Sequence, residues 1–265
     1  MTTPAELKAL AREIAAEAAE LAARRRAEGV AVAASKSSLA DIVTEADREV
    51  EALIRSRLAA ARPDDGFLGE ESGDAGGTSG ITWVVDPIDG TVNYAFGMPA
   101  WAVSIAAVEG PADPLGWRAL AGVVHAPRLG EVFEAAAGEG AHLDGRRLRV
   151  TSEAPAGALI ATGFGYDPTT HAAALGVLQR VMPIARDLRR GGAASLDLAY
   201  VAAGRLDGYY ERGLSPWDHA AGALLVQEAG GRIAWHPADE TGRALIVAAG
   251  PAVFDALDRV VREDA

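Results

Sequence analysis

The first thirty positions carry apolar residues at the spacing of an α-helix. Four large apolar side chains recur at intervals of three, four and seven in an alanine-rich background: Leu7, Leu10, Ile14 and Leu21. This period places them on one face, so it predicts an amphipathic helix from Pro4 to about Glu28. Gly29 follows as the expected stop signal.

A polar loop over residues 35–38 precedes a second predicted helix. The run Thr44-Glu45-Ala46-Asp47 has the Thr-x-x-acid form of a capping box, which predicts a helix that runs to about Ala61. Residues 67–72 form a short apolar run that ends in acids, and we expect a strand there. The Gly/Ser-rich segment 73–80 predicts a mobile loop.

The middle of the chain has the pattern of paired strands. The stretch WVVDPIDGTVNY begins with an apolar run, Trp83 to Val85, that predicts a buried strand. A second strand is expected over 101–109. Two further runs, 120–125 and 131–135, flank the turn sequence 127–130 and predict a hairpin.

The second half alternates short strands with helices, which is the α/β pattern. The expected strands are 158–162, 184–188, 208–210, 232–235 and 245–248, and the expected helices are 169–182, 193–203, 217–229 and 251–262. There are no internal repeats and no long linker. We therefore predict one catalytic unit over 1–265, with an α+β half at about 1–150 packed on an α/β half at about 151–265.

Composition narrows the class of protein. Hydrophobic residues make up 49% and charged residues 23% of the 265 positions, which is typical of a globular protein with a sizeable core. The net charge of −12 argues against nucleic acid or an anionic membrane as partner. No run approaches the ~18 apolar residues of a membrane span, and the N-terminus has no secretory signal pattern. We expect a cytoplasmic protein.

Cysteine is absent, so disulfides, thiolate metal sites and cysteine nucleophiles are excluded. Lysine is nearly absent as well. Of 25 basic residues, Lys8 and Lys36 are the only lysines, and the rest are arginine. A lysine retained in such a background is a candidate functional residue.

Carboxylates gather at the ends of apolar runs in three places: Glu70-Glu71, Asp86 with Asp89, and Asp218. Like charges brought together in a site of low dielectric raise one another's pKa, and a bound cation removes the conflict. The donors are oxygen atoms, which favours a hard cation such as Mg²⁺ over Zn²⁺.

The run D86-P-I-D-G-T91 has a plain alternative explanation, because Asp-Pro and Asp-Gly are common turn dipeptides. The combination offers more than a turn. It joins two carboxylates to a rigid proline, to Gly90, which permits close backbone approach, and to a hydroxyl where a helix could begin. Free amides at Gly90 and Thr91 would form an anion site beside the carboxylates, which indicates metal-assisted phosphoryl chemistry.

The chain resembles the inositol monophosphatase family along nearly its whole length. The residues that carry the resemblance are G69-E-E-S72, D86-P-I-D-G-T91 with V92-N-Y94, and W217-D-H-A-A-G222, in the family's order. Further positions in register are Lys36-Ser37-Ser38, D41-I-V-T-E-A-D47, G192-A-A194 and Tyr210-Glu211. The resemblance implies a layered αβαβα sandwich, a homodimer and dependence on Mg²⁺.

The resemblance also implies roles. Two to three Mg²⁺ ions would be held by Glu70, Asp86, the carbonyl of Ile88, Asp89 and Asp218, with Asp86 as the bridge. Glu70 and Thr91 would position and deprotonate the attacking water. The amides of Gly90 and Thr91 would hold the phosphate. The alcohol part of a small phosphorylated polyol would contact Asp89, Ala194, Glu211 and Asp218.

Several positions keep two interpretations. Asp47 is either the acid of the capping box or a group near the metal site, and Lys36 is either a solvated loop residue or a group that faces the phosphate. His219 follows Asp218 but is not expected to be a ligand. Arg189-Arg190 could clamp an anion or form a subunit contact, and we favour the contact. Related bacterial sequences often have proline where Gly165 stands, which leaves the fit of the substrate open.

The favoured reaction is hydrolysis of myo-inositol monophosphate to inositol and phosphate, because V92-N-Y94 resembles the inositol phosphatase branch. Histidinol phosphate, fructose bisphosphate and a nucleotide phosphate are the alternative substrates. A non-enzymatic alternative is a partner role in a transcription or RNA-processing complex, which some similar proteins have.

Overall fold

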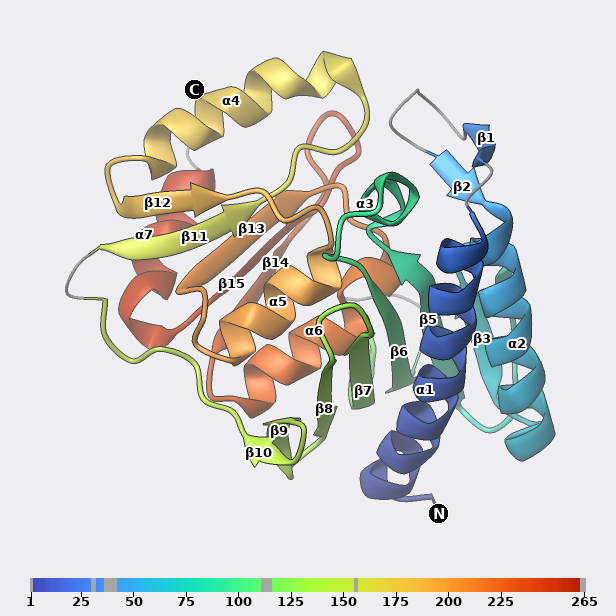
Figure 1. Ribbon diagram of the computed structural model, residues 1–265. Coiled ribbons are helices and arrows are strands. Elements are labelled where there is room, and N and C mark those ends of the chain that lie inside the picture. The colour runs from blue at the N-terminus through green and yellow to red at the C-terminus, as the bar shows by residue number, and fades with distance from the viewer. Residues whose placement is uncertain (1, 30–31, 36–41, 111–115, 155–156, 263–265) are drawn as a thin grey trace.

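The computed structural model describes residues 2–29, 32–35, 42–110, 116–154 and 157–262 (Figure 1). In these residues the strands form one small hairpin and two larger sheets. The hairpin pairs β1 (Val32–Ser35) with β2 (Ile42–Thr44) in antiparallel orientation. Ser35, which the sequence analysis placed in a loop, is therefore the last residue of a strand.

The larger sheet has eight strands in the order β10-β9-β8-β7-β6-β5-β3-β4. β3 and β5 pair in parallel, and the remaining neighbours are antiparallel. The strands are β3 (Gly66–Gly69), β4 (Gly73–Ala75), β5 (Ile81–Asp89), β6 (Ala102–Glu109), β7 (Arg118–Ala126), β8 (Glu131–Ala136), β9 (Gly140–Leu143) and β10 (Arg146–Arg147). The hairpin predicted around residues 127–130 is confirmed as β7–β8.

The second sheet has five strands in the order β12-β11-β13-β15-β14. β11 runs parallel to β12 and β13, while β15 is antiparallel to both of its neighbours. The strands are β11 (Ala158–Thr162), β12 (Ala185–Arg189), β13 (Gly208–Arg212), β14 (Arg232–His236) and β15 (Leu245–Ala249). Each lies within two residues of its predicted range.

Helices separate and cover the sheets, so that the layers follow the order α, β, α, β, α (Figure 1). α1 (Pro4–Glu28) and α2 (Glu45–Ala61) pack on the outer face of the larger sheet. α5 (Ala194–Ala202) and α6 (Pro216–Glu228) lie between the sheets, and α4 (His171–Val181) and α7 (Pro251–Arg262) cover the far side of the smaller sheet. The predicted layered αβαβα sandwich is confirmed.

The first helix shows how the sequence pattern produces this packing. The Thr3 hydroxyl accepts a hydrogen bond from the amide of Glu6, and the Glu6 carboxylate accepts one from the amide of Thr3, so a capping box begins α1. Leu7 and Ile14 are fully buried against the larger sheet. Burial of each such side chain contributes about 1.5–3 kcal/mol.

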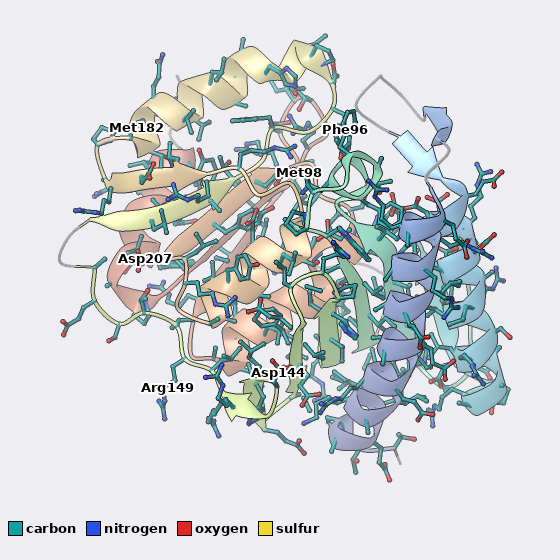
Figure 2. The ribbon with its side chains drawn as sticks, viewed as in Figure 1. Phe96, Met98, Asp144, Arg149, Met182 and Asp207 are labelled. Carbon is teal, nitrogen blue, oxygen red and sulfur yellow. The ribbon has the colours of Figure 1, made fainter. Side chains whose placement is uncertain are left out.

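Two local expectations were wrong. Residues 73–80 were predicted to be a mobile loop, but Gly73–Ala75 forms β4 and pairs with β3. β9 and β10 were not predicted, because β10 has only two residues and the turn between them is short. Asp144 adopts a positive φ of 48° in that turn (labelled in Figure 2), a conformation that aspartate tolerates better than most residues.

β5 is longer than its apolar run predicted. It continues past Val85 through Pro87 to Asp89, and its pairing with β6 shifts register between Asp86 and Asp89. Asp86 pairs with Ser104, whereas Asp89 pairs with Ala102, so β5 holds one extra residue. Proline cannot donate a ladder hydrogen bond, which explains why the irregularity lies here. The bulge brings both aspartates to the end of the strand.

Candidate active site

Acidic side chains from distant parts of the chain meet at the end of β5. One carboxylate oxygen each from Asp86, Asp89 and Asp218 lie within 4.8 Å of one another. Asp218 is in the first turn of α6, and it accepts a hydrogen bond at 2.6 Å from the amide of Ser215. Glu70, which follows β3, lines the same cavity. The structure therefore brings together the four carboxylates that the sequence analysis selected.

Burial and mutual repulsion raise the pKa values of these groups. Burial, followed by the charges of Glu70, Asp89 and Asp218, raises the pKa of Asp86 well above its usual range. Burial, followed by the charge of Asp89, also raises the pKa of Asp218 well above its usual range. Burial also raises the pKa of Asp89, but hydrogen bonds from Ser195 and Ala194 offset part of the rise and leave it at about 6. A cation among these oxygens would stabilise their charged forms.

Asp89 is held by the start of α5. Its carboxylate accepts hydrogen bonds from the amides of Ala194 at 3.2 Å and Ser195 at 2.7 Å. The Ser195 hydroxyl donates a third, at 2.5 Å. These contacts span more than a hundred residues of sequence and fix one aspartate of the cluster to the layer between the sheets.

Gly90 and Thr91 begin the short helix α3 (Thr91–Phe96) directly after β5. Gly90 has φ 87°, and a Cβ there would lie 3.0 Å from the carbonyl oxygen of Ala100 and 3.1 Å from Ala193. The positive φ therefore favours glycine, and a side chain here would also have to push its neighbours back slightly. The Thr91 hydroxyl lies 3.1 Å from the carbonyl oxygen of Ile88 and 3.3 Å from the Asp47 carboxylate.

A cavity of about 500 Å³ opens over the acidic cluster. Its lining includes every predicted site residue except two: Glu70, Asp86, Ile88, Asp89, Gly90, Thr91, Ala194, Glu211 and Asp218. The exceptions are Asp47, which is 1% exposed and contacts the site through Thr91, and Lys36. Lys36 lies outside the described residues, as does the side chain of Thr44, the expected capping partner of Asp47.

Several residues that support the cavity were not predicted from the sequence. Ser195 bonds to Asp89, and the Asn93 amide donates to the carbonyls of Ala100 and Gly191 at 2.7 and 2.9 Å. Asp197, 5% exposed in α5, also lines the cavity. Burial, together with the charges of Asp89 and Glu211, raises the pKa of Asp197 to about 8. Asn93 was visible in the motif after Thr91, but nothing in the local sequence links Asp197 to the acids.

Arg190 lines the cavity, and its charge lowers the pKa values of Asp197 and Glu211 against the effect of burial. This position supports the anion-contact alternative for Arg190 over the subunit contact that we favoured. Arg189 instead pairs with Asp187 at 2.7 Å on the exposed strand β12.

Gly165 also lines the cavity and has φ 67°. Proline cannot adopt a positive φ, so the loop here differs in backbone conformation from one that carries proline. His219 is 2% exposed, and its ring packs 4.3 Å from that of Trp235 and 6.1 Å from that of Trp117. Burial lowers the pKa of His219 to about 3.

Comparison with known proteins agrees with the fold and the site. The sequence profile of the inositol monophosphatase family matches residues 3–255. Inositol-1-monophosphatase SuhB of Mycobacterium tuberculosis is 43% identical over 274 residues, which cover 96% of this chain and 92% of that protein. The Escherichia coli protein named Nus factor SuhB is 40% identical over 242 residues, which cover 88% of this chain and 87% of that protein.

Solved structures give the same result. The crystal structure of extragenic suppressor protein suhB from Bartonella henselae is similar to this chain with a TM-score of 0.85 and 36% identity, covering 98% of this chain and 99% of that one. Fold, acidic cluster and relatives together define an enzyme of the phosphatase class. The chain belongs to the inositol monophosphatase family. No helix among its described residues is long and apolar enough to cross a membrane.

Proposed function

We propose that this phosphatase hydrolyses myo-inositol monophosphate to inositol and phosphate with the help of Mg²⁺. The observation that carries the proposal is the cluster of Asp86, Asp89 and Asp218 at the base of a 500 Å³ cavity. The cavity has room for a phosphorylated ring the size of a sugar, and its far wall carries polar groups that suit hydroxyls.

The donor set fits a hard divalent cation. It consists of carboxylate oxygens and the carbonyl of Ile88, without sulfur or imidazole. Glu70, Asp86, Ile88, Asp89 and Asp218 would hold two to three Mg²⁺ ions, with Asp86 shared between two of them. Bound there, Mg²⁺ would supply Lewis acidity and neutralise charge that develops on the phosphate and the leaving oxygen.

The protein's own groups would orient the attacking water. Thr91 and Glu70 both line the cavity, and the Thr91 hydroxyl is fixed between the Ile88 carbonyl and Asp47. Glu70 would accept the proton of the water, and Thr91 would set its direction. In this arrangement Asp47 acts through Thr91. Lys36 keeps its sequence-based role as a group that faces the phosphate.

Substrate contacts divide between the two ends of the cavity. The amides of Gly90 and Thr91 would hold the phosphate, next to the acids. Asp89, Ala194, Glu211 and Asp218 would contact the hydroxyls of the polyol. Glu211 is well placed to accept hydrogen bonds, because Tyr209 already donates to one of its oxygens at 2.6 Å and thereby fixes the carboxylate.

A substrate panel tests the proposal. Phosphate release would be measured from inositol 1-phosphate, histidinol phosphate, fructose 1,6-bisphosphate and a nucleotide phosphate, each with Mg²⁺ and with EDTA. We expect the highest kcat/KM for inositol 1-phosphate and no release without Mg²⁺. Faster turnover of another substrate would reject the inositol assignment, and equal release in EDTA would reject the metal requirement.

We also propose that the protein is a cytoplasmic homodimer. Large apolar side chains lie exposed on α3, after it, and after α4: Phe96 at 79%, Met98 at 56% and Met182 at 53% (Figure 2). Phe96 and Met98 lie near each other and suit a contact with a second copy, whereas Met182 lies apart from them (Figure 2). Light scattering on a sizing column would give twice the mass of 27.3 kDa, and a monomer at micromolar concentration would contradict the proposal.

A role in a transcription complex is the second candidate, because the Escherichia coli relative is named a Nus factor. The cluster of buried acids favours the enzyme. The variant Asp86→Asn separates the two: it would abolish the phosphate release of an enzyme, whereas a partner role would survive it. Capture of transcription proteins by both the wild type and this variant, in the absence of any phosphatase activity, would favour the second candidate.

A further inference from the structure

A second cavity, of about 230 Å³, lies behind the wall of the first. It is lined by α4, the ends of β11, β13 and β15, the segment 239–243 and the end of α7. It shares with the active-site cavity only Thr162, Gly163, Glu211 and Arg243, and none of the clustered aspartates lines it. The second cavity is thus a separate space that touches the substrate side of the first.

Positive charge dominates its lining. Four arginines line it (Arg180, Arg212, Arg243 and Arg262), against two acids, Glu211 and Asp239. Asp239 is already engaged, since it accepts hydrogen bonds from the Thr241 hydroxyl and from the amide of Arg243. The Arg180 guanidinium donates through Nε at 3.1 Å to the carbonyl of Val260, a neutral partner. Arg212 pairs with Asp239 at 3.5 Å, and Arg262 pairs with Asp258 at 3.1 Å. Arg180 and Arg243 then stand against Glu211 alone, so the lining keeps a net positive charge that a bound anion would neutralise.

Tyr210 contributes a buried hydroxyl to the lining of this cavity. The side chain is 5% exposed, and its oxygen reaches no partner at hydrogen-bond geometry among the described residues. A buried hydroxyl without a partner is unfavourable, and native proteins rarely leave one unless a ligand or water completes it. Burial raises the pKa of Tyr210, while a polar contact with the Thr162 side chain and the charge of Arg180 offset part of that rise. Arg180 and Tyr210 line the same cavity.

The remaining wall is apolar. Val177 of α4, Leu245 of β15 and Val261 of α7 line it together with alanines. A cavity of this size is smaller than the usual site for a drug-sized molecule. Its composition suits a compact ligand with one charged end and one apolar end.

We propose that this cavity binds a small organic anion, whose charged group bonds to Arg180 and Tyr210 and whose apolar body packs on Val177, Leu245 and Val261. The charged group would accept a hydrogen bond from the Tyr210 hydroxyl and charge-assisted hydrogen bonds from the Arg180 guanidinium. The class of ligand is a small carboxylate, sulfonate or phosphonate that carries a ring or short hydrocarbon.

Such a ligand would affect substrate binding, a consequence that rests on the proposed function. Glu211 lines both cavities, and Gly163 packs so closely on its carboxylate that a Cβ at Gly163 would overlap it. A ligand that displaces the 162–163 backbone therefore moves Glu211. Because Glu211 is proposed to contact the polyol, we expect a change in KM for inositol 1-phosphate with kcat nearly constant.

Calorimetric titration of the full-length protein with benzenesulfonate tests the binding step. The neutral isostere benzenesulfonamide serves as the matched ligand, and each titration is run with and without Mg²⁺, so that binding to a metal in the first cavity is recognised. We expect binding of benzenesulfonate that Arg180→Gln weakens by about tenfold or more and Tyr210→Phe weakens less. Arg259→Gln, an exposed arginine of α7 outside the cavity, would leave the affinity unchanged.

Three results would each overturn the proposal: no binding at concentrations up to about 10 mM, equal binding of the sulfonamide, or the same affinity in a folded Arg180→Gln. If Arg180→Gln fails to fold by circular dichroism, Val177→Trp, which fills the cavity without removing charge, replaces it and must abolish binding. Binding is measured without turnover, so its outcome is independent of whether inositol 1-phosphate is the substrate.

Discussion

Removal of the Ser195 hydroxyl should weaken Mg²⁺ binding in a pH-dependent way. In Ser195→Ala the carboxylate of Asp89 keeps its two amide donors but loses the hydroxyl donor at 2.5 Å. All three hydrogen bonds favour the charged carboxylate, and they hold the pKa of Asp89 at about 6 against the effect of burial. Without the hydroxyl, that pKa must rise.

The size of the effect follows from the burial of the contact, since Ser195 is fully buried. A hydrogen bond to a buried charged group contributes ~1.5–3 kcal/mol, and one pKa unit corresponds to about 1.4 kcal/mol. The pKa of Asp89 in the metal-free variant would therefore rise by about one to two units. At pH 7 a proton then competes with Mg²⁺ for this carboxylate, and the Mg²⁺ concentration for half-maximal activity rises by about two- to tenfold.

Phosphate release would be titrated with Mg²⁺ at pH 7 and at pH 8.5 for both proteins. The ratio of the two half-maximal Mg²⁺ concentrations, variant over wild type, should be closer to one at pH 8.5, where Asp89 is charged in either protein. Asp86 and Asp218 titrate in both proteins, so their effect cancels from the ratio. Ser104→Ala is the matched control, because this buried serine makes only a 3.4 Å bond to the Trp217 carbonyl. A ratio that stays at one, or that is the same at both pH values, would refute the reasoning.

Three further predictions concern charge and backbone. Asp86→Asn should reduce kcat/KM by about a thousandfold or more, measured as Mg²⁺-dependent phosphate release, while residual activity above a tenth of wild type would contradict its central role. Asp89 and Asp197 have folded pKa values of about 6 and about 8, above the unfolded value of 3.8. The unfolded state therefore loses their protons first as pH rises, and the metal-free protein should melt at a lower temperature at pH 8 than at pH 5.5. Mg²⁺ should raise the melting temperature more at pH 8, and a flat profile in EDTA would argue against the raised pKa values. Gly165→Pro should lower the free energy of unfolding in urea by about 1–3 kcal/mol, because φ 67° is closed to proline, and Gly165→Ala should lower it less, because alanine can adopt a positive φ. An equal loss in the two variants would show that crowding of any Cβ by Arg243 sets the cost and that φ does not.

Periodicity predicted most of the secondary structure because strands and helices bury one face in a regular pattern. The helix over 4–28 has the predicted bounds, and so does the helix over 251–262. The short strands β4, β9 and β10 were not predicted, because so few residues show no alternating pattern. Pairing with neighbouring strands stabilises them. The bulge at Pro87 is likewise visible only when β6 lies beside β5.

The sequence by itself determined the family, the order of the layers and the identity of the acids, because each acid stands in a local motif at the end of an apolar run. Only the tertiary structure decided which groups surround those acids. Ser195 bonds to Asp89 and Asp197 lines the cavity, although neither carries a local pattern that indicates a site. Arg190 lines the cavity as well, whereas the sequence left an anion clamp and a subunit contact open for it. Their roles depend on contacts across about a hundred residues of chain, which the packing of α5 between the two sheets creates.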